Sequence, residues 1–140
     1  TKESADLFLI LMIHLLKDGG RAAIVLPDGS LTGDGVKERI RKKLLEDCNL
    51  HTIIRLPNSV FQPYASVATN LLFFTKGEPT KNVWYYQHKL PEGYKAYSKT
   101  KQIQLAEFEK SLDPLSRTTI GKMEAELVTN LAATKPTSKL

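Results

Sequence analysis

The stretch Arg21-Ala-Ala-Ile-Val-Leu-Pro27 decides how this chain folds. It is apolar without the alternation of polar and apolar residues that marks a half-exposed strand. Such a run is typical of a strand covered on both faces, as in a parallel sheet. We therefore predict a buried strand over residues 21–27, with helices that cover it.

The segment before this strand predicts a helix over residues 4–17. Its residues are apolar nearly all round, so we expect the helix to be buried on several sides. The Ser4 hydroxyl can cap the first turn. Gly19 and Gly20 end the helix, because glycine adopts the left-handed conformation at low cost.

One more helix and three more strands follow the first strand. A loop over residues 28–35 leads into a helix over residues 36–46, and a second loop covers residues 58–69. Apolar or aromatic runs bounded by turn residues predict the strands; these cover residues 50–57, 70–75 and 83–87. Alternating helices and covered strands predict a layered α/β sheet. Because the first helix needs a sheet to bury it, we interpret the chain as the second half of a larger domain.

The pattern weakens after residue 88. Residues 89–100 are polar and predict a loop, and short helices are predicted around residues 103–112 and 120–133. Residues 134–140 are typical of a frayed end. We therefore divide the chain into a sheet-forming part, residues 1–88, and a partly helical C-terminal tail, residues 89–140.

Composition limits the class of protein. The 140 residues suffice for one domain or part of one, and the net charge of +5 tolerates an anionic partner without requiring it. The single cysteine, Cys48, excludes an internal disulfide, fits a reducing cytosol and is expected to pack as a small apolar group. The three histidines lack ligand spacing, so no metal site is predicted. The longest apolar run, residues 7–13, is far shorter than the ~20 residues of a membrane span. Because no positively charged leader with a small-residue cleavage site stands before this run, we do not expect it to be a signal peptide, and we expect a cytoplasmic protein without a membrane partner.

Three sequence blocks carry a resemblance to a known family. They are Gly19-Gly-Arg-Ala-Ala-Ile-Val-Leu-Pro27, Ile53-Ile-Arg-Leu-Pro-Asn-Ser-Val-Phe61 and Val67-Ala-Thr-Asn-Leu-Leu-Phe-Phe-Thr-Lys-Gly77. In their order and spacing, residues 4–88 resemble the modification subunit of type I restriction–modification systems, an N6-adenine DNA methyltransferase. The resemblance implies a Rossmann-like, seven-stranded methyltransferase sheet that uses S-adenosylmethionine. Residues 1–88 would be the C-terminal half of this catalytic domain.

The resemblance also implies what this chain lacks. In the family, the upstream half holds a glycine-rich cofactor loop and an Asn-Pro-Pro-Phe motif, and neither occurs in these 140 residues. S-adenosylmethionine would therefore be bound mainly by the missing upstream half. This chain would hold no catalytic or cofactor-binding residue and would be inactive alone. The implied partners are DNA, the specificity and restriction subunits of the same system, and the missing half of the domain.

Phe61 is the residue we expect to meet the target base. In the family, the loop before the last hairpin presents an aromatic ring to the adenine swung out of the duplex, and Phe61 occupies that motif position. An aromatic face replaces part of the stacking that an extruded base loses. The alternative is that Phe61 fills the core between the last two strands. Tyr64 is a second candidate for lining the site, with an ordinary surface position as its alternative.

Asp28 follows the predicted strand over residues 21–27. Ligand crevices form at the carboxyl ends of strands in open α/β sheets, so Asp28 is a candidate for lining the site. The alternative is local turn chemistry, because Pro-Asp-Gly is itself a turn signal. The glycines at positions 29, 33 and 35 do not form a phosphate loop, since no Lys-Ser/Thr pair follows them.

Basic residues crowd the helix predicted over residues 36–46. We single out Lys37 and Arg41 as DNA phosphate contacts, with a solvated helix face as the alternative. Arg55 lies inside a predicted strand, where an unpaired guanidinium is costly. We therefore expect Arg55 to pair with a carboxylate or to reach the sheet edge.

Two other functions stay open. The chain could be a non-enzymatic module that uses this half-fold to contact DNA or protein. It could also belong to a methyltransferase-like enzyme for RNA or a small molecule, since this kind of sheet serves many substrates.

Overall fold

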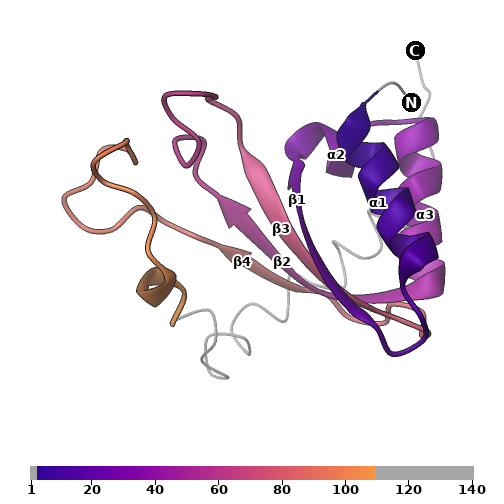
Figure 1. Ribbon diagram of the computed structural model, residues 1–140. Helices are drawn as coiled ribbons and strands as arrows, with labels where there is room; N and C mark the ends of the chain where they lie inside the picture. The colour runs from indigo at the N-terminus through magenta and orange to yellow at the C-terminus, as the bar shows by residue number, and fades with distance from the viewer. Residues whose placement is uncertain (1–2, 110–140) are drawn as a thin grey trace, which may run out of the picture.

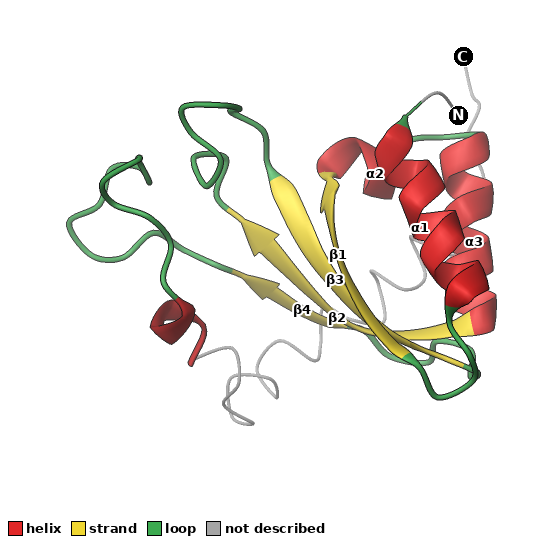
Figure 2. Cartoon of the chain, viewed as in Figure 1, coloured by secondary structure: helices red, strands yellow, loops and turns green. Residues whose placement is uncertain are grey.

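A computed structural model describes residues 3–109, which form a four-stranded mixed sheet with the three α-helices gathered on one side and a short 3-10 helix away from them (Figures 1 and 2). In chain order, the elements are α1 (Ser4–Leu15), β1 (Arg21–Pro27), α2 (Asp28–Thr32), α3 (Val36–Asp47), β2 (Cys48–Leu56), β3 (Thr69–Lys76), β4 (Trp84–Gln87) and the 3-10 helix η1 (Leu105–Phe108). The layered α/β architecture predicted from the sequence is confirmed.

The strand order is β1-β3-β2-β4. β3 pairs antiparallel with both β1 and β2, so β1 and β2 run in the same direction, and β4 joins β2 in parallel. Thr69, the first residue of β3, pairs with Pro27 on one side and Leu56 on the other. The carboxyl ends of β1 and β2 therefore meet at one edge of the sheet.

The hydrophobic core lies between the sheet and the helices. Alternate residues of β3 point into it, because side chains of a strand alternate between the two faces; Leu72 and Phe74 are fully buried. α1 contributes Leu9 and Ile13, and α3 contributes Leu44 to the same cluster. Cys48 is buried as expected, and burial raises the pKa of its thiol.

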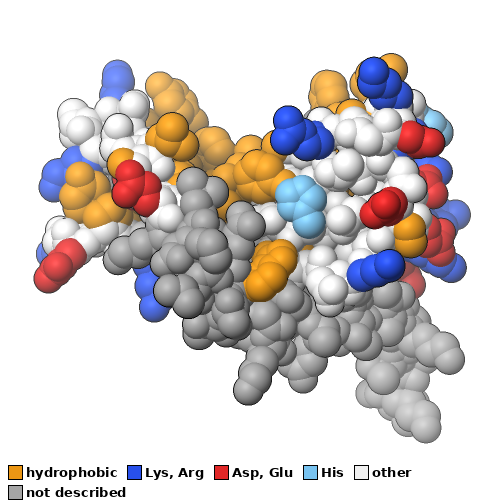
Figure 3. All heavy atoms as spheres, turned by 90° about the horizontal axis from the view of Figure 1, so that it is seen from below, with side chains coloured by type: hydrophobic (Ala, Val, Ile, Leu, Met, Phe, Trp, Pro, Cys, Tyr) orange, Lys and Arg blue, Asp and Glu red, His pale blue; other side chains and the backbone are white. Residues whose placement is uncertain are grey.

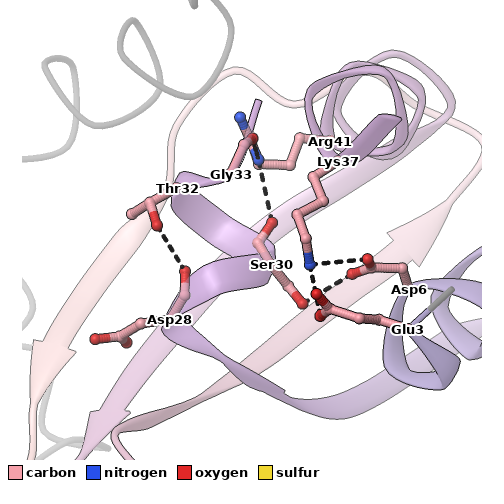
Figure 4. A network of polar contacts seen from close by, with 8 residues as sticks. All are labelled: Glu3, Asp6, Asp28, Ser30, Thr32, Gly33, Lys37 and Arg41. Atoms are coloured by element: carbon pink, nitrogen blue, oxygen red, sulfur yellow. Dashed lines mark hydrogen bonds and ion pairs between the residues drawn. The ribbon is translucent and has the colours of Figure 1, made fainter. Parts of the chain in front are cut away.

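A polar network ties the three helices together (Figure 4). The buried Asp6 carboxylate of α1 accepts a hydrogen bond from Ser30 Oγ of α2 at 2.8 Å and from Lys37 Nζ of α3 at 2.9 Å. Glu3 is the second acidic partner of Lys37, at 2.7 Å. Hydrogen bonds with Glu3 and then Asp6 raise the pKa of Lys37, so this ammonium group stays charged inside the network.

The same network holds Lys37 and Arg41, the two side chains that the sequence analysis singled out as DNA phosphate contacts. Arg41 is only 3% exposed, and its Nη1 donates to the backbone carbonyls of Ser30 at 3.2 Å and Gly33 at 2.7 Å. Burial lowers the pKa of Arg41. Lys37 is neutralised by two carboxylates. The basic face of α3 thus turns partly inward to fasten α1 and α2, and contact of Lys37 and Arg41 with DNA phosphates stays a prediction.

Several element predictions need correction. The first helix stops at Leu15, two residues before the predicted end, and Glu3 rather than Ser4 is the N-cap, without a side-chain capping bond. Part of the loop predicted over residues 28–35 forms α2. The helix predicted over residues 103–112 is a single 3-10 turn within the described residues. The helix predicted over 120–133 and the end over 134–140 lie outside them. The strands predicted over 50–57, 70–75 and 83–87 are confirmed as β2, β3 and β4.

Burial on both faces was the wrong prediction for β1 and for the first helix. β1 is an edge strand paired with β3 alone, and of its side chains only Leu26 is buried. α1 buries one face only. Large apolar side chains on its other face are exposed, 59% in the case of Phe8; the others are Leu7, Leu11 and Leu15. This chain therefore presents an apolar helix face and a strand edge that nothing described here covers.

The uncovered face leads to a prediction about the isolated chain. Exposed strand edges and apolar patches drive association, so the 140-residue polypeptide should self-associate in sedimentation velocity. Replacing Phe8 and Leu11 together by Gln should shift it toward monomer, because both residues lie on the exposed face. Leu9→Gln, on the buried face of the same helix, should instead unfold the chain. A monodisperse monomer with wild-type sequence would contradict this prediction.

Candidate functional site

A charged cluster lies where the ends of β1 and β2 meet. Asp28 begins α2 directly after β1, and its Oδ2 accepts a hydrogen bond from Arg55 Nη2 of β2 at 2.5 Å. Its Oδ1 accepts from Asn70 Nδ2 of β3 at 2.7 Å. The Asp28 backbone N–H donates to the Ala68 carbonyl at 3.2 Å. One aspartate thus connects three strands. Arg55 pairs with a carboxylate, as predicted for a guanidinium inside a strand.

The cluster holds both stems of the loop between β2 and β3. Arg55 lies just before this loop, and Asn70 lies just after it. Arg55 and Asn70 are paired in the β2–β3 ladder, and because both side chains bind the same carboxylate, the base of the loop is also tied to the end of β1. The hydrogen bond with Tyr85, and then the charge of Asp28, outweigh partial desolvation and raise the pKa of Arg55. The guanidinium therefore stays protonated over the physiological range.

The loop itself presents two aromatic rings. It consists of consecutive tight turns, with Val60 N–H donating to Pro57 at 3.3 Å and Tyr64 N–H donating to Phe61 at 2.9 Å. The peptide bond between Gln62 and Pro63 is cis. Phe61 is 39% exposed and Tyr64 is 87% exposed. An aromatic ring this open to solvent does not fill the core, so the exposure of Phe61 argues against the core-filling alternative.

Phe61 and Tyr64 line the same pocket. Its volume is about 390 Å³, and its other wall comes from a distant segment of the chain that includes Ser98, Lys99 and Gln102. A second hollow of about 400 Å³ lies at the strand ends, between Arg55 and His88. The structure therefore brings the two predicted aromatic residues together. Asp28 belongs to the base of their loop.

The segment after β4 packs on this loop, which sequence reasoning missed. Tyr97 is fully buried, and its backbone N–H donates to Ser59 Oγ at 3.0 Å. The Tyr97 hydroxyl donates to Glu107 Oε2 and lies 2.9 Å from His88 Nε2. The alternation of tyrosines with lysines in this region gave no apolar periodicity, so only the three-dimensional structure reveals the packing.

Charges in this second cluster are set by burial and hydrogen bonds. Burial opposes the ionisation of Glu107, but hydrogen bonds from Tyr97, the Gln104 backbone and His88 outweigh it and lower the pKa of this carboxyl group. Burial, followed by the hydrogen bond to Glu107, raises the pKa of Tyr97. The phenol is therefore neutral and the carboxylate charged, so the phenol can serve as the donor in this pair.

Two further classes of site were tested in the described part of the chain. No group of three or more His, Cys, Asp or Glu side chains there could hold a metal ion. No helix among residues 3–109 is long and apolar enough to cross a membrane.

Comparison with known proteins decides the family. The family described as N-6 DNA Methylase matches residues 1–133. The chain belongs to the N-6 DNA methylase family. It is 61% identical over 113 residues to the type I restriction enzyme EcoEI methylase subunit of Escherichia coli, a match that covers 81% of this chain. The resemblance noted in the three sequence blocks is thereby confirmed.

Solved structures agree with this membership in the N-6 DNA methylase family. A modification subunit of a putative type I restriction enzyme from Vibrio vulnificus YJ016 has 49% sequence identity and a TM-score of 0.72, and the match covers 80% of this chain and 25% of that one. A chain from a structure on complex assembly and conformational transition of the type I R-M system has 34% identity and a TM-score of 0.79. That match covers 94% of this chain and 31% of that one.

This family member is homologous to only part of those proteins. It spans 23% of the length of the EcoEI methylase subunit. The described mixed α/β fold is accordingly similar to one part of a methylase subunit.

The shared carboxylate predicts what happens when Asp28 is changed. In an intact methylase subunit that carries this segment, Asp28→Asn should increase hydrogen exchange of the amides over residues 58–68, because both loop stems lose a charged acceptor. Stability should fall by about 1 kcal/mol or less, since the Asp28–Arg55 pair is partly exposed and screened by solvent. Asp34→Asn, an exposed aspartate beyond α2, is the matched control and should change neither. Unchanged exchange in Asp28→Asn would show that the loop does not depend on this cluster.

Proposed function

We propose that this chain is the target-base half of the catalytic domain of a DNA adenine-N6 methyltransferase, the modification subunit of a type I restriction–modification system. One observation carries the proposal: Phe61 stands exposed on a turn-rich loop whose stems are fastened at Asp28, at the carboxyl edge of the sheet. A ring held in this way, free on its face and fixed at its base, suits stacking against an extruded base.

The uncovered face of the chain supports an upstream partner within the same domain. We propose that the missing half adds further strands at the free edge of β1, completing a Rossmann-like sheet of seven strands, and covers the apolar face of α1. Both surfaces then become buried, which removes the cost of exposing Phe8 and Leu11 to water.

The residues at the sheet edge do not make up a cofactor site by themselves. The Asp28 carboxylate is already bound by a guanidinium and an amide, and the one Gly-x-Gly of the sequence, at residues 33–35, follows α2 rather than a strand. We therefore propose that S-adenosylmethionine, which supplies the methyl group when bound, is held mainly by the upstream half. On the present chain, Phe61 holds the base, Tyr64 borders it, and Asp28 with Arg55 orients their loop.

The proposed partners follow from this assignment. They are DNA, the missing half of the domain, and the specificity and restriction subunits of the same system. Since its substrate is DNA, we propose that the protein acts in the cytoplasm. Alone, the chain should be inactive, because the groups expected to bind the cofactor and the target amino group lie outside it.

The proposed function is tested with the intact methylase subunit assembled with its specificity subunit. Incubation with S-adenosylmethionine and duplex DNA should yield N6-methyladenine, detected by mass spectrometry of the digested nucleosides. The isolated 140-residue chain is the control and should yield none. Methyl transfer to another base, to RNA only or to a small molecule would overturn the proposal.

Changing Phe61 separates a stacking role from a structural one. Phe61→Ala in the intact enzyme should lower DNA-side catalytic efficiency about ten- to a hundredfold, because base–aromatic stacking contributes about 1–3 kcal/mol. Affinity for the cofactor should not change, and Phe61→Trp should retain much of the activity. Val67→Ala, an exposed apolar residue of the same loop without an aromatic face, is the matched control.

Two measurements decide the role of Phe61. One is a melting curve, and the other is the fluorescence of 2-aminopurine at the target adenine, which reports stacking of the extruded base. If Phe61→Ala melts much earlier than wild type while the base still flips and stacks normally, the ring has a structural role and the stacking assignment is wrong.

A further inference from the structure

A basic turn stands beside the aromatic loop. Ser98 and Lys101 exchange two backbone hydrogen bonds, of 3.0 and 3.1 Å, which close a tight turn with Lys99 at its tip. Ser98 Oγ also accepts from the Lys101 N–H at 3.2 Å. The Lys99 side chain is exposed and lines the same pocket as Phe61 and Tyr64. A positive charge is thus fixed close to the proposed base-binding ring.

Buried contacts of Tyr97 hold the turn against the aromatic loop. Tyr97, the residue just before it, is buried and donates its N–H to Ser59 Oγ, two residues before Phe61. The Tyr97 hydroxyl is in turn held by Glu107 and His88. The basic turn and the aromatic loop therefore rest on one common anchor, and the relative position of Lys99 and Phe61 is defined by buried contacts.

Charge sets the chemistry of a ligand for this surface. Residues 89–103 carry four lysines and one glutamate, whereas residues 58–69 carry no charged side chain. Lys101 also lies over the Tyr94 ring, at 5.2 Å from Nζ to the ring centroid, which holds its ammonium group at the surface of the turn. Figure 3 shows Lys and Arg side chains beside hydrophobic ones at the end of the molecule where these loops lie. An anion with an apolar or aromatic neighbour fits such a surface.

We infer that the turn from Ser98 to Lys101 binds the phosphodiester backbone of the DNA strand whose base stacks on Phe61. A phosphate contact carries no sequence information but fixes the position of the strand. Lys99 of the turn then contacts a phosphate and Phe61 of the loop stacks on the base, so both the phosphate and the base of one nucleotide are bound. This inference rests on the proposed function and adds a backbone contact beyond those predicted for Lys37 and Arg41.

The test measures how salt weakens DNA binding by the intact methylase subunit assembled with its specificity subunit. Each lost phosphate contact should lower the slope of log K against log salt by about 0.9, so the double variant Lys99→Gln, Lys101→Gln should lose about two. The loss should be the same for target and non-target duplexes. The double variant Lys99→Arg, Lys101→Arg keeps the charges and should retain the wild-type slope.

The matched control is the double variant Lys17→Gln, Lys81→Gln. Both lysines are exposed, and they lie in connections at the opposite end of the sheet, so the net charge changes equally while the slope should stay as in wild type. Equal slopes in the test and control variants would overturn the inference. So would a test variant that weakens assembly with the specificity subunit but keeps the slope once assembled, because the turn would then bind protein. If wild type neither binds DNA nor methylates adenine, the proposed function itself fails, and that outcome is distinct from a failure of this contact.

Discussion

The antiparallel position of β3 between β1 and β2 is the constraint on which the rest of the structure depends. It makes β1 and β2 run in the same direction, so their carboxyl ends reach the same edge, on either side of Thr69. Asp28 leaves one strand at this edge, and the aromatic loop leaves the other. Loops at this edge are the usual place for ligands in α/β sheets. The pairing of β3 with both strands therefore brings residues from distant parts of the sequence together at this edge.

Two polar clusters lie next to this edge, one around Asp28 and one around Tyr97. They contribute more to the placement of the loops than to the free energy of unfolding. Partly exposed ion pairs contribute little to the free energy of unfolding, and the pair of Asp28 with Arg55 is of this kind. Its value is that one carboxylate ties the base of the loop, where Arg55 and Asn70 are paired in the ladder, to the end of β1. The cluster of His88, Tyr97 and Glu107 is buried, so its hydrogen bonds are stronger and costlier to break. Together the clusters fix the backbone of the loops that carry the exposed side chains.

Sequence reasoning succeeded where the signal is local. The strands β2, β3 and β4 and the helix α3 follow from apolar runs and turn residues, and a guanidinium inside a strand predicted a carboxylate partner for Arg55. It failed where the burial or bonding of a residue depends on elements that are distant in the sequence. An apolar run predicted two covered faces for β1, yet β1 is an edge strand in the described sheet and only its Leu26 side chain is buried. The charges on α3 do not reveal that Arg41 bonds to the carbonyl of Ser30 in α2 and to that of Gly33 just after it. The clustering of Tyr97 with Ser59 depends on a contact across 38 positions.

Exposed apolar residues in this protein fall into two kinds, and the difference bears on function. The exposed side chains of α1 form one continuous face of a regular helix beside an unpaired strand edge, which is the surface expected to be buried within a larger domain. Phe61 is instead a single ring on an uncharged loop, set apart by tight turns and anchored from two sides. If the ring were buried in the core, it would be removed from water, but no ligand could reach its face. Under the proposed function, a ring that stacks on an extruded base has to remain open before the base arrives. An exposed ring on a loop whose base and neighbour Ser59 are held by hydrogen bonds meets this requirement.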